Sequence, residues 1–228
     1  MTVAVFHGPV RYVLHDGTTD PVPPRGVTVK AGSTVAGAER QQLLAAFNGG
    51  FLMRSHAGGY IQEAHVFKTP RHGMASLVID RSGQARIGIW GDTVPAPGED
   101  VYSVRQNLWA LVLNGQVTAQ AAKWQRWGGT VGHVEYVARS ALGQDAAGNL
   151  IYVASMSATP EDLAQTLAQS GAVIGMEMDI NPEWVQLDTA GTPGGPLSAA
   201  IPGQNRPADQ YISGWTRDFI TVLASSGV

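Results

Sequence analysis

Short apolar stretches separated by polar, glycine-containing turns make up most of this chain. Val10–His15 alternates between apolar and polar residues, which predicts a strand. The apolar runs Ala75–Asp80 and Ala85–Trp90 flank a short polar turn and predict a hairpin. A second hairpin is predicted over Leu111–Val117, where Asn114-Gly115 suits a two-residue turn. Because hairpins join strands that are neighbours in sequence, these patterns indicate mainly antiparallel pairing.

A third hairpin precedes the clearest helix signal of the chain. Val134–Leu142 and Leu150–Ser155 flank a turn-rich segment and predict two paired strands. Thr159 suits the N-cap position, a proline follows at the first helical position, and two acidic residues stand in the first turn. Gly171 ends the segment. We therefore predict a helix over Pro160–Ser170.

The apolar strand after Gly171 completes a strand–helix–strand unit. Such a unit requires a parallel pair of strands joined by a right-handed crossover. Good helix formers over Glu39–Ala46 indicate a second helix. The sequence thus predicts an α+β fold, with residues 1–228 forming a single domain on a mainly antiparallel mixed sheet with one β-α-β crossover.

The strand after Gly171 runs directly into acidic residues. Glu177 and Asp179 are two residues apart, so on an extended strand they point to the same face, roughly 7 Å from each other. Ligands gather at the carboxyl ends of parallel strands, and this spacing suits a catalytic or metal-binding pair. In the alternative interpretation, each acid pairs with an arginine or caps a turn. Asn181-Pro182 indicates a turn in which Glu183 is solvated.

Two more positions carry candidate chemistry. Arg139 lies in an otherwise apolar predicted strand, and a buried guanidinium needs an anionic partner. That partner is Asp179, Glu177 or a substrate phosphate, and a purely structural ion pair is the alternative. Asn48 stands in a loop with Gly49 and Gly50, where the glycines let a ligand approach the main chain. An ordinary Asn-Gly turn between strands would have the same sequence.

Composition narrows the class of protein. A chain of 228 residues with 44% hydrophobic residues is long enough for one substantial core. The net charge of -3, with 14% charged residues, provides no basic surface for nucleic acid and no polybasic anchor for anionic lipid. Small molecules or glycans are the expected partners. We recognise neither a signal peptide nor an apolar run of about 18 residues, so we expect no membrane-spanning segment.

Several kinds of site are disfavoured by the residues present. The chain has no cysteine, which excludes disulfides, thiolate metal sites and cysteine nucleophiles. Its six histidines show no helical His-Glu-x-x-His spacing, so we predict no zinc site. Neither a Gly-x-Ser-x-Gly elbow nor a phosphate-binding P-loop is present.

An ordered set of motifs resembles the phosphodiester glycosidase family. The family pattern is an Asn-Gly-Gly-Phe loop, then Arg-Thr-Ala-x-Gly, then Leu-Asp-Gly-Gly-Gly-Ser after a crossover helix. The chain keeps the first motif, has Ser140 in the second, and keeps Asp179 but carries Ile180–Glu183 in the third. That replacement resembles a bacterial branch of the family. The resemblance extends from Arg40 to Ala224, and its other segments are Gly58–Tyr60, Ser76–Asp80, Val104–Asn107, Leu111–Gly115, Arg206–Tyr211 and Arg217–Phe219.

The resemblance implies a glycoside hydrolase that cleaves the bond between a sugar's anomeric carbon and phosphate in a sugar-1-phosphodiester. It also implies a cell-surface glycan or glycoconjugate as substrate, an extracytoplasmic location and no required cofactor. Asp179 would be the nucleophile or general base and Glu177 its partner. Arg139 would grip the phosphate oxygens with both arms of its guanidinium. The residues expected to orient the substrate are Asn48, Gly49, Gly50 and Asn181.

Two alternatives belong to other classes of function. The first is a non-catalytic glycan- or cell-wall-binding module of the same fold, in which tryptophans stack on sugars. The second has the acids binding Ca²⁺ or Mg²⁺ through oxygen ligands. Activity on a sugar-1-phosphodiester separates the enzyme from the binding module, and a chelator tests the metal. Neither the sugar, the aglycone nor the oligomeric state follows from the sequence.

Overall fold

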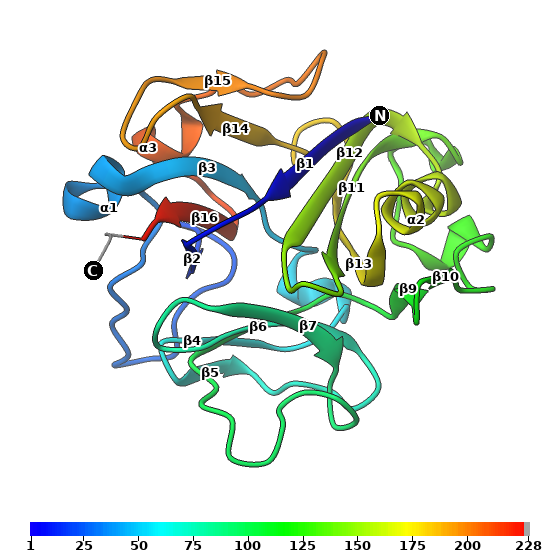
Figure 1. The fold of residues 1–228 in the computed structure, drawn as a ribbon, viewed down its shortest axis with the longest axis horizontal. Coiled ribbons are helices and arrows are strands. Elements are labelled where there is room, and N and C mark those ends of the chain that lie inside the picture. The colour runs from blue at the N-terminus through cyan, green and yellow to red at the C-terminus, as the bar shows by residue number, and fades with distance from the viewer. Residues whose placement is uncertain (226–228) are drawn as a thin grey trace.

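Three antiparallel sheets and three short helices build the fold in the computed structural model, which describes residues 1–225 (Figure 1). The first sheet has six strands in the order β1-β12-β11-β13-β9-β10. Its strands are β1 (Thr2–Phe6), β12 (Leu150–Ala158), β11 (Val137–Asp145), β13 (Ala172–Ile180), β9 (Ala110–Leu113) and β10 (Gln116–Val117).

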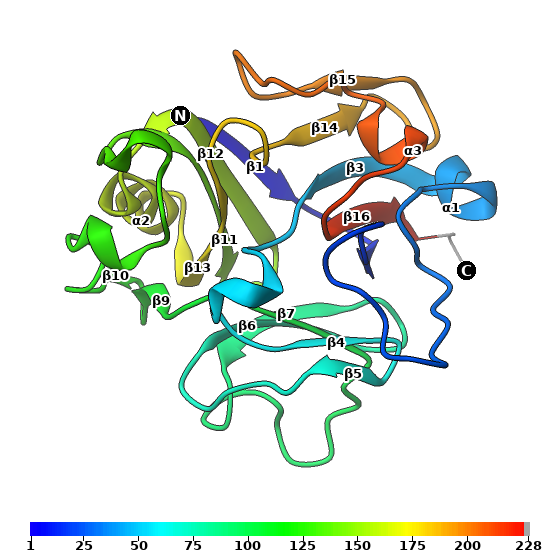
Figure 2. The same ribbon diagram turned by 180° about the vertical axis from the view of Figure 1, so that it is seen from behind.

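The second and third sheets have five strands each. The second, in spatial order, contains β15 (Leu197–Ala199), β14 (Leu187–Ala190), β3 (Leu43–Asn48), β16 (Phe219–Ala224) and β2 (Val10–His15). The third contains β5 (His65–Lys68), β4 (Tyr60–Gln62), β8 (Ser103–Gln106), β6 (Ala75–Ile79) and β7 (Ala85–Ile89). Seen from behind, the three sheets surround a common centre (Figure 2).

That centre is one continuous apolar core. Leu14 and Phe47 from the second sheet, Leu77 from the third, and Tyr152 and Met178 from the first belong to the same buried cluster. Removing apolar surface of this extent from water is the main favourable contribution to folding. The core therefore fixes the three sheets against one another, and with them the loops that meet at their ends.

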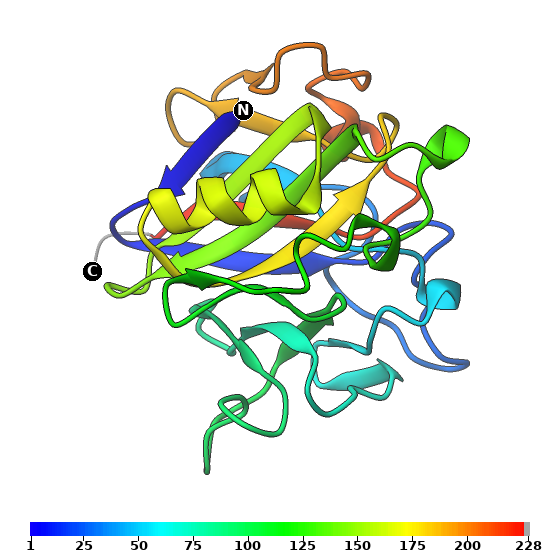
Figure 3. The same ribbon diagram turned by 90° about the vertical axis from the view of Figure 1, so that its right-hand side faces the viewer.

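The helices are short and lie on the outside of the sheets. They are α1 (Gly37–Gln42), α2 (Pro160–Gln169) and α3 (Gln210–Ser213), with 3₁₀ turns at Met53–Ser55 (η1), Trp124–Arg126 (η2) and Val131–His133 (η3). α2 packs across the outer face of the first sheet through Leu163 and Leu167 (Figure 3). In the described residues, no helix is long and apolar enough to cross a membrane.

The predicted hairpins are confirmed. β6 pairs with β7, β9 with β10, and β11 with β12, all antiparallel. The predicted strand Val10–His15 is β2, and the predicted helix over Pro160–Ser170 is α2. These elements depend on local turn and cap chemistry, which the sequence carries directly.

The predicted mixed sheet is not what the structure shows. Every ladder between named strands is antiparallel, and the parallel contacts in the described residues are two isolated bridges. α2 connects β12 to β13, but these strands do not pair with each other because β11 lies between them. The expected parallel pair joined by a crossover is therefore absent from residues 1–225.

The predicted second helix is also shorter than expected. α1 ends at Gln42, and the chain continues as β3 from Leu43. β3 is the central strand of the second sheet and pairs with both β14 and β16. Leu43, Phe47 and Asn48 are all buried, so packing on both sides overrides the helix propensity of this segment.

Candidate active site

Asp179 is the one of the two predicted site acids that lines a cavity. β13 carries it to the end of the first sheet, where it lines a cavity of about 460 Å³. The rest of the wall comes from five separate segments: Phe51, Leu52 and Ser55; Leu108; Gln125, Arg126, Gly128 and Gly129; Ile180, Asn181 and Trp184; and Arg217. We call this space the Asp179 cavity.

Arg217 is the partner of Asp179. Its Nη2 donates to Asp179 Oδ2 at 2.8 Å and to the carbonyl oxygen of Gly50 at 2.9 Å. The guanidinium lies over the ring of Trp184, with 4.8 Å between the guanidinium carbon and the ring centroid. Its Nε is buried without a hydrogen-bond partner among the described residues. Among the described residues, the hydrogen bonds of this guanidinium all come from Nη2, and the residue lines the cavity.

Burial raises the pKa of Asp179 to about 7, although Arg217 and the backbone N–H of Ile180 oppose the shift. The Ile180 amide donates to Oδ1 at 2.8 Å, and Arg217 holds Oδ2, so both oxygens are oriented. A carboxyl group with this pKa changes protonation near neutral pH, which is a property of many catalytic acids and bases.

Glu177 has a different environment from Asp179. Arg139 Nη1 donates to Glu177 Oε1 at 2.8 Å, and neither side chain is exposed. Arg139 also donates to the carbonyl oxygens of Trp127 and Ala158. Burial raises the pKa of Glu177 to about 8, against the opposing effect of Arg139. Neither Glu177 nor Arg139 lines the Asp179 cavity.

A slip in strand register separates the two acids. Arg139 lies opposite Ile180, whereas Ala141 lies opposite Glu177, so β13 holds one extra residue over this stretch. Such a bulge interrupts the simple alternation of side chains. The prediction that Glu177 and Asp179 share a face assumed regular alternation, which does not hold here. The structure gives each acid its own arginine.

The Asn48 loop lies behind the cavity wall. Asn48 is buried, donates to Gly49 O and Ser140 Oγ, and accepts from the Tyr152 hydroxyl at 2.6 Å and the Gln186 amide at 3.1 Å. All the polar atoms of its side chain are therefore occupied by the protein, and Asn48 does not line the cavity.

The two glycines after Asn48 are needed for packing against a buried ion pair. Arg105 Nε donates to Asp218 Oδ2 at 2.6 Å, and both side chains are fully buried. A Cβ on Gly49 would lie 2.0 Å from Asp218 Oδ2, and one on Gly50 would lie 2.8 Å from Arg105. The Asn-Gly-Gly-Phe loop is thus held by this pair, and it delivers Phe51 to the cavity.

Asn181 lines the cavity, but its amide is engaged by the neighbouring loop. Oδ1 accepts from the Val131 amide at 2.8 Å, and Nδ2 donates to the Gly129 carbonyl at 3.3 Å. Of the seven predicted site residues, Asp179 and Asn181 line the cavity, Gly50 contacts Arg217, and the others lie in the layer behind. Those others are Glu177, Arg139, Asn48 and Gly49.

A second cavity of about 470 Å³ adjoins the first. The two share Leu52, Trp184 and Arg217 as common wall. The rest of the second cavity is lined by Thr19, Asp20, Arg54 and Thr216. Arg217 therefore lines both cavities.

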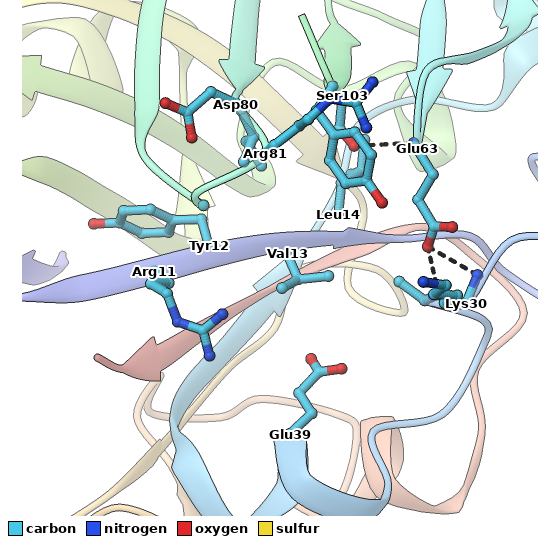
Figure 4. A pocket seen from close by; sticks show the side chains of 14 residues that line it. Arg11, Tyr12, Val13, Leu14, Lys30, Glu39, Glu63, Asp80, Arg81 and Ser103 are labelled. Carbon is cyan, nitrogen blue, oxygen red and sulfur yellow. Dashed lines mark hydrogen bonds between the residues drawn. The ribbon is translucent and has the colours of Figure 1, made fainter. Parts of the chain in front are cut away.

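A third cavity, of about 260 Å³, lies between β2 and the third sheet (Figure 4). It has acidic and basic walls, but its acids already serve the fold. Glu63 accepts from the backbone amides of Lys30 and Ala31, Asp80 caps its own turn, and Glu39 contacts His15. The Asp179 cavity is the better candidate for chemistry because a carboxyl group with a pKa of about 7 and its arginine partner line the same wall.

Within residues 1–225, no three histidine, aspartate or glutamate side chains are grouped so as to hold a metal ion. The acids of the site face arginines instead. Charge compensation in this region therefore comes from guanidinium groups.

The sequence predicts no site role for Arg217, Phe51, Gly128 or Gly129, and it indicates Trp184 only as a tryptophan that could stack on a sugar. Arg217 and Phe51 stood within motifs that resembled a family, but no local pattern indicated that they would meet Asp179. Arg217 comes from the segment before β16, and Asp179 from β13 of a different sheet. A signal for Arg217 did exist, since it is a cation directly before an acid and an apolar strand.

Comparisons with known proteins concern the family and the fold of the chain. A family model described as phosphodiester glycosidase matches residues 41–179, more than half of the chain. The fold is similar to the zebrafish N-acetylglucosamine-1-phosphodiester alpha-N-acetylglucosaminidase catalytic domain auto-inhibited by pro-peptide, with a TM-score of 0.58 and 15% identity over 98% of this chain and 76% of that one. It is also similar to a hypothetical protein from Synechocystis, with a TM-score of 0.53 and 14% identity over 98% of this chain and 57% of that one. No curated protein sequence matches the chain.

Proposed function

The chain belongs to the phosphodiester glycosidase family, and we propose that it hydrolyses the bond between a sugar's anomeric carbon and phosphate in a sugar-1-phosphodiester. The proposed substrate is a carbohydrate-containing diester of a cell-surface glycoconjugate. The zebrafish relative is named for N-acetylglucosamine-1-phosphodiester, which makes the diester of that sugar the first substrate to test.

The Asp179–Arg217 pair on the cavity wall is the observation that carries this proposal. A carboxylate beside a sugar suits a glycosidase, and an arginine in the same cavity wall suits a phosphate. An ordinary glycosidase has little use for a guanidinium beside the aglycone. Both groups line one cavity, so a sugar and its phosphate can contact them together.

The leaving group explains why one carboxyl group is sufficient at the cavity. Cleavage releases a phosphate monoester, whose second pKa is about 6, so it leaves without full protonation. Positive charge and hydrogen-bond donors stabilise the developing phosphate dianion in place of a strong acid. Arg217 is placed to supply both.

Asp179 then acts on the anomeric carbon as nucleophile or general base. The contacts from Arg217 and the Ile180 amide orient its oxygens for this role. Glu177 and Arg139 support it from behind, since their ion pair lies next to Asp179 on the same strand pair. In this account Arg217, rather than Arg139, binds the phosphate.

The alternative is a glycan-binding module without turnover. Trp184 favours it, because its partly exposed ring lies in the wall of both adjoining cavities and an indole ring can stack on a sugar. This alternative predicts saturable binding of a glycan and no product.

The test is a panel of sugar-1-phosphodiesters, starting with the N-acetylglucosamine compound, incubated with the purified chain. Released sugar and phosphate monoester are quantified. The wild-type protein should turn over at least one diester, with and without a chelator, and Asp179→Asn should not. Binding of a diester without release of product would instead support the glycan-binding module.

A further inference from the structure

One wall of the Asp179 cavity is a short backbone segment, residues 127–131, which we call the strap. Gly128 and Gly129 of the strap line the cavity. The strap begins at Trp127, whose fully buried ring packs edge-on against Trp109 at a centroid distance of 6.1 Å. Arg139 Nη1 donates to the Trp127 carbonyl at 3.1 Å. One end of the strap is therefore anchored in the interior.

The other end is held by Asn181. Its side chain accepts from the Val131 amide at 2.8 Å and donates to the Gly129 carbonyl at 3.3 Å. Among residues 1–225, these are the hydrogen bonds that join residues 128–131 to a distant part of the chain. The strap's remaining bonds, such as Thr130 Oγ1 to the Val134 carbonyl, are local.

Packing gives the outer end little further support. Val131 is 65% exposed, and residues 132–136 after it are exposed as well. On the inner side, a Cβ on Gly128 would lie 2.7 Å from the Phe51 ring and 2.8 Å from Ile180. The strap thus lies directly against Phe51 and Ile180 at Gly128. Beyond that point Thr130 is buried, and Asn181 makes the hydrogen bonds that join the strap to a distant segment.

Asn181 itself is built rigidly into the end of β13. Its backbone has a φ of 75°, in the left-handed region that asparagine tolerates better than most residues. Its amide donates to the Ala138 carbonyl at 2.8 Å, and its carbonyl accepts from the Trp184 amide at 3.1 Å. Asn181 therefore joins the strap to the segment that carries Asp179 and Trp184.

From these contacts we propose that Asn181 is a positioning residue that holds the strap as a wall of the Asp179 cavity and so sets the width of the substrate-binding space. Asn181 acts on substrate binding through the strap, not on the anomeric carbon. The expected effect of Asn181 on KM rests on the proposed function, whereas its expected effect on the strap does not.

The first readout is amide hydrogen exchange over residues 128–133, which requires no substrate. Asn181→Gly removes both side-chain bonds and accepts the φ of 75° without strain. Exchange of the Val131 amide should accelerate about tenfold or more, the order expected from losing one or two net hydrogen bonds. Asn181→Asp keeps a side-chain oxygen that can accept from the Val131 amide, so this amide should retain most of its protection from exchange. Protection unchanged in Asn181→Gly would overturn the proposal.

The second readout is kinetic and compares two glycines of similar φ. Gly128→Ala should displace the strap, because its Cβ meets Phe51 and its φ is 89°. Gly148→Ala is the matched control, since its φ is 90°, a Cβ there has nothing within 4 Å, and Gly148 does not line the cavity. Asn181→Gly and Gly128→Ala should each raise KM about tenfold with kcat within about threefold, and Gly148→Ala should not. Because Asn181→Gly and Gly128→Ala both act through the strap, the KM of the double variant should not exceed the higher KM of the two single variants.

The outcomes distinguish the two proposals. Faster exchange in Asn181→Gly with no cleavage by the wild-type protein would overturn the proposed function and leave Asn181 as the residue that holds the strap. Cleavage by the wild-type protein, with kcat rather than KM changed in Asn181→Gly, would overturn the positioning role and retain the proposed function.

Discussion

Asp179 and Glu177 show how environment separates two carboxyl groups on one strand. Asp179 contacts Arg217 and faces a cavity, while Glu177 contacts Arg139 and is closed off from solvent. Burial raises the pKa of both. Of the two, Asp179 lines the cavity and Glu177 does not, so the two residues differ in what their loss should do.

Asp179→Asn should keep the fold and reduce kcat about 100-fold or more, the scale of general acid–base or nucleophilic catalysis. A nucleophile or base must be ionised, so kcat/KM of the wild-type protein should rise with pH and level off above about 7, the pKa of Asp179. Two measurements check these predictions: kcat of Asp179→Asn, and kcat/KM of the wild-type protein at pH values on both sides of 7. A profile that instead falls as pH rises through 7 would make Asp179 a general acid.

Above about pH 8, where Glu177 is ionised, Arg139→Met should destabilise the protein strongly, because it leaves the Glu177 carboxylate buried without its partner. Breaking a buried pair from one side costs about 3–5 kcal/mol of the free energy of unfolding. Arg139→Met combined with Glu177→Met should recover much of that loss, since no buried charge remains. Urea unfolding of the three proteins measures this. If Arg139→Met were as stable as the wild-type protein, the ion pair would not stabilise the fold, and Arg139 would again be a candidate ligand for the substrate.

Single residues were predictable where the signal was local. The sequence placed Asp179 at a strand end and required an anionic partner for Arg139, and the structure provides Glu177. It did not indicate Arg217, because the contact between Arg217 and Asp179 spans 38 positions and two sheets. Nor did it indicate the bulge that separates the acids, since register is set by pairing with β11.

At the scale of elements, α2 is the clearest case of local control. Thr159 accepts from the Asp162 amide, and Asp162 accepts from the Thr159 amide, which forms a capping box. Thr159→Ala should lower the free energy of unfolding by about 1 kcal/mol, and Thr159→Ser should retain most of it. Chemical denaturation of both variants checks this. Equal stability of the alanine and serine variants would contradict the role of the cap.

The junction between α1 and the second sheet has a charge-dependent contact. Glu39 Oε1 lies 2.7 Å from His15 Nε2 and accepts from Thr221 Oγ1 at 2.7 Å. Burial acts to raise the pKa of Glu39, but the contacts with His15 and Thr221 outweigh it, and the pKa falls below 4.5.

The lowered pKa gives the sign of a pH effect. Because the folded pKa is depressed, the contribution of Glu39 to stability is present above about pH 4.5 and is lost as the pH falls through the folded value. Glu39→Gln should therefore lose stability near neutral pH and approach the wild-type protein in acid. Unfolding free energies of both proteins between pH 3 and 7 test this. A difference that does not depend on pH would contradict it.

Element prediction failed where tertiary pairing decides the outcome. Residues 43–46 have good helix formers but become β3, because that strand is needed between β14 and β16. The strand–helix–strand unit was recognised, yet β11 lies between its two strands. The sequence pattern shows which elements exist. It does not show that β11, the first strand of the β11–β12 hairpin, also pairs with β13 and so lies between β12 and β13.

At the scale of the whole molecule, three sheets around one core bring distant segments of the chain to the Asp179 cavity. Phe51 follows β3, the strap precedes β11, Asp179 ends β13, and Arg217 precedes β16. Buried ion pairs, Arg105 with Asp218 and Arg139 with Glu177, lie behind these segments. The site therefore depends on the correct docking of the first and second sheets, and the family match covers only part of it because Arg217 lies beyond residue 179.

The central claim is that the cavity recognises phosphate attached to a sugar, with Arg217 as the ligand. The most direct test compares kcat/KM for a sugar-1-phosphodiester and for the alkyl glycoside of the same sugar. Wild-type protein should prefer the diester by about 100-fold or more, since charge-assisted, bidentate contacts to phosphate are absent with the glycoside. Arg217→Lys keeps the charge but loses the planar fork, so it should shrink that preference about tenfold. Equal rates on the two substrates, with a ratio that Arg217→Lys leaves unchanged, would contradict the account.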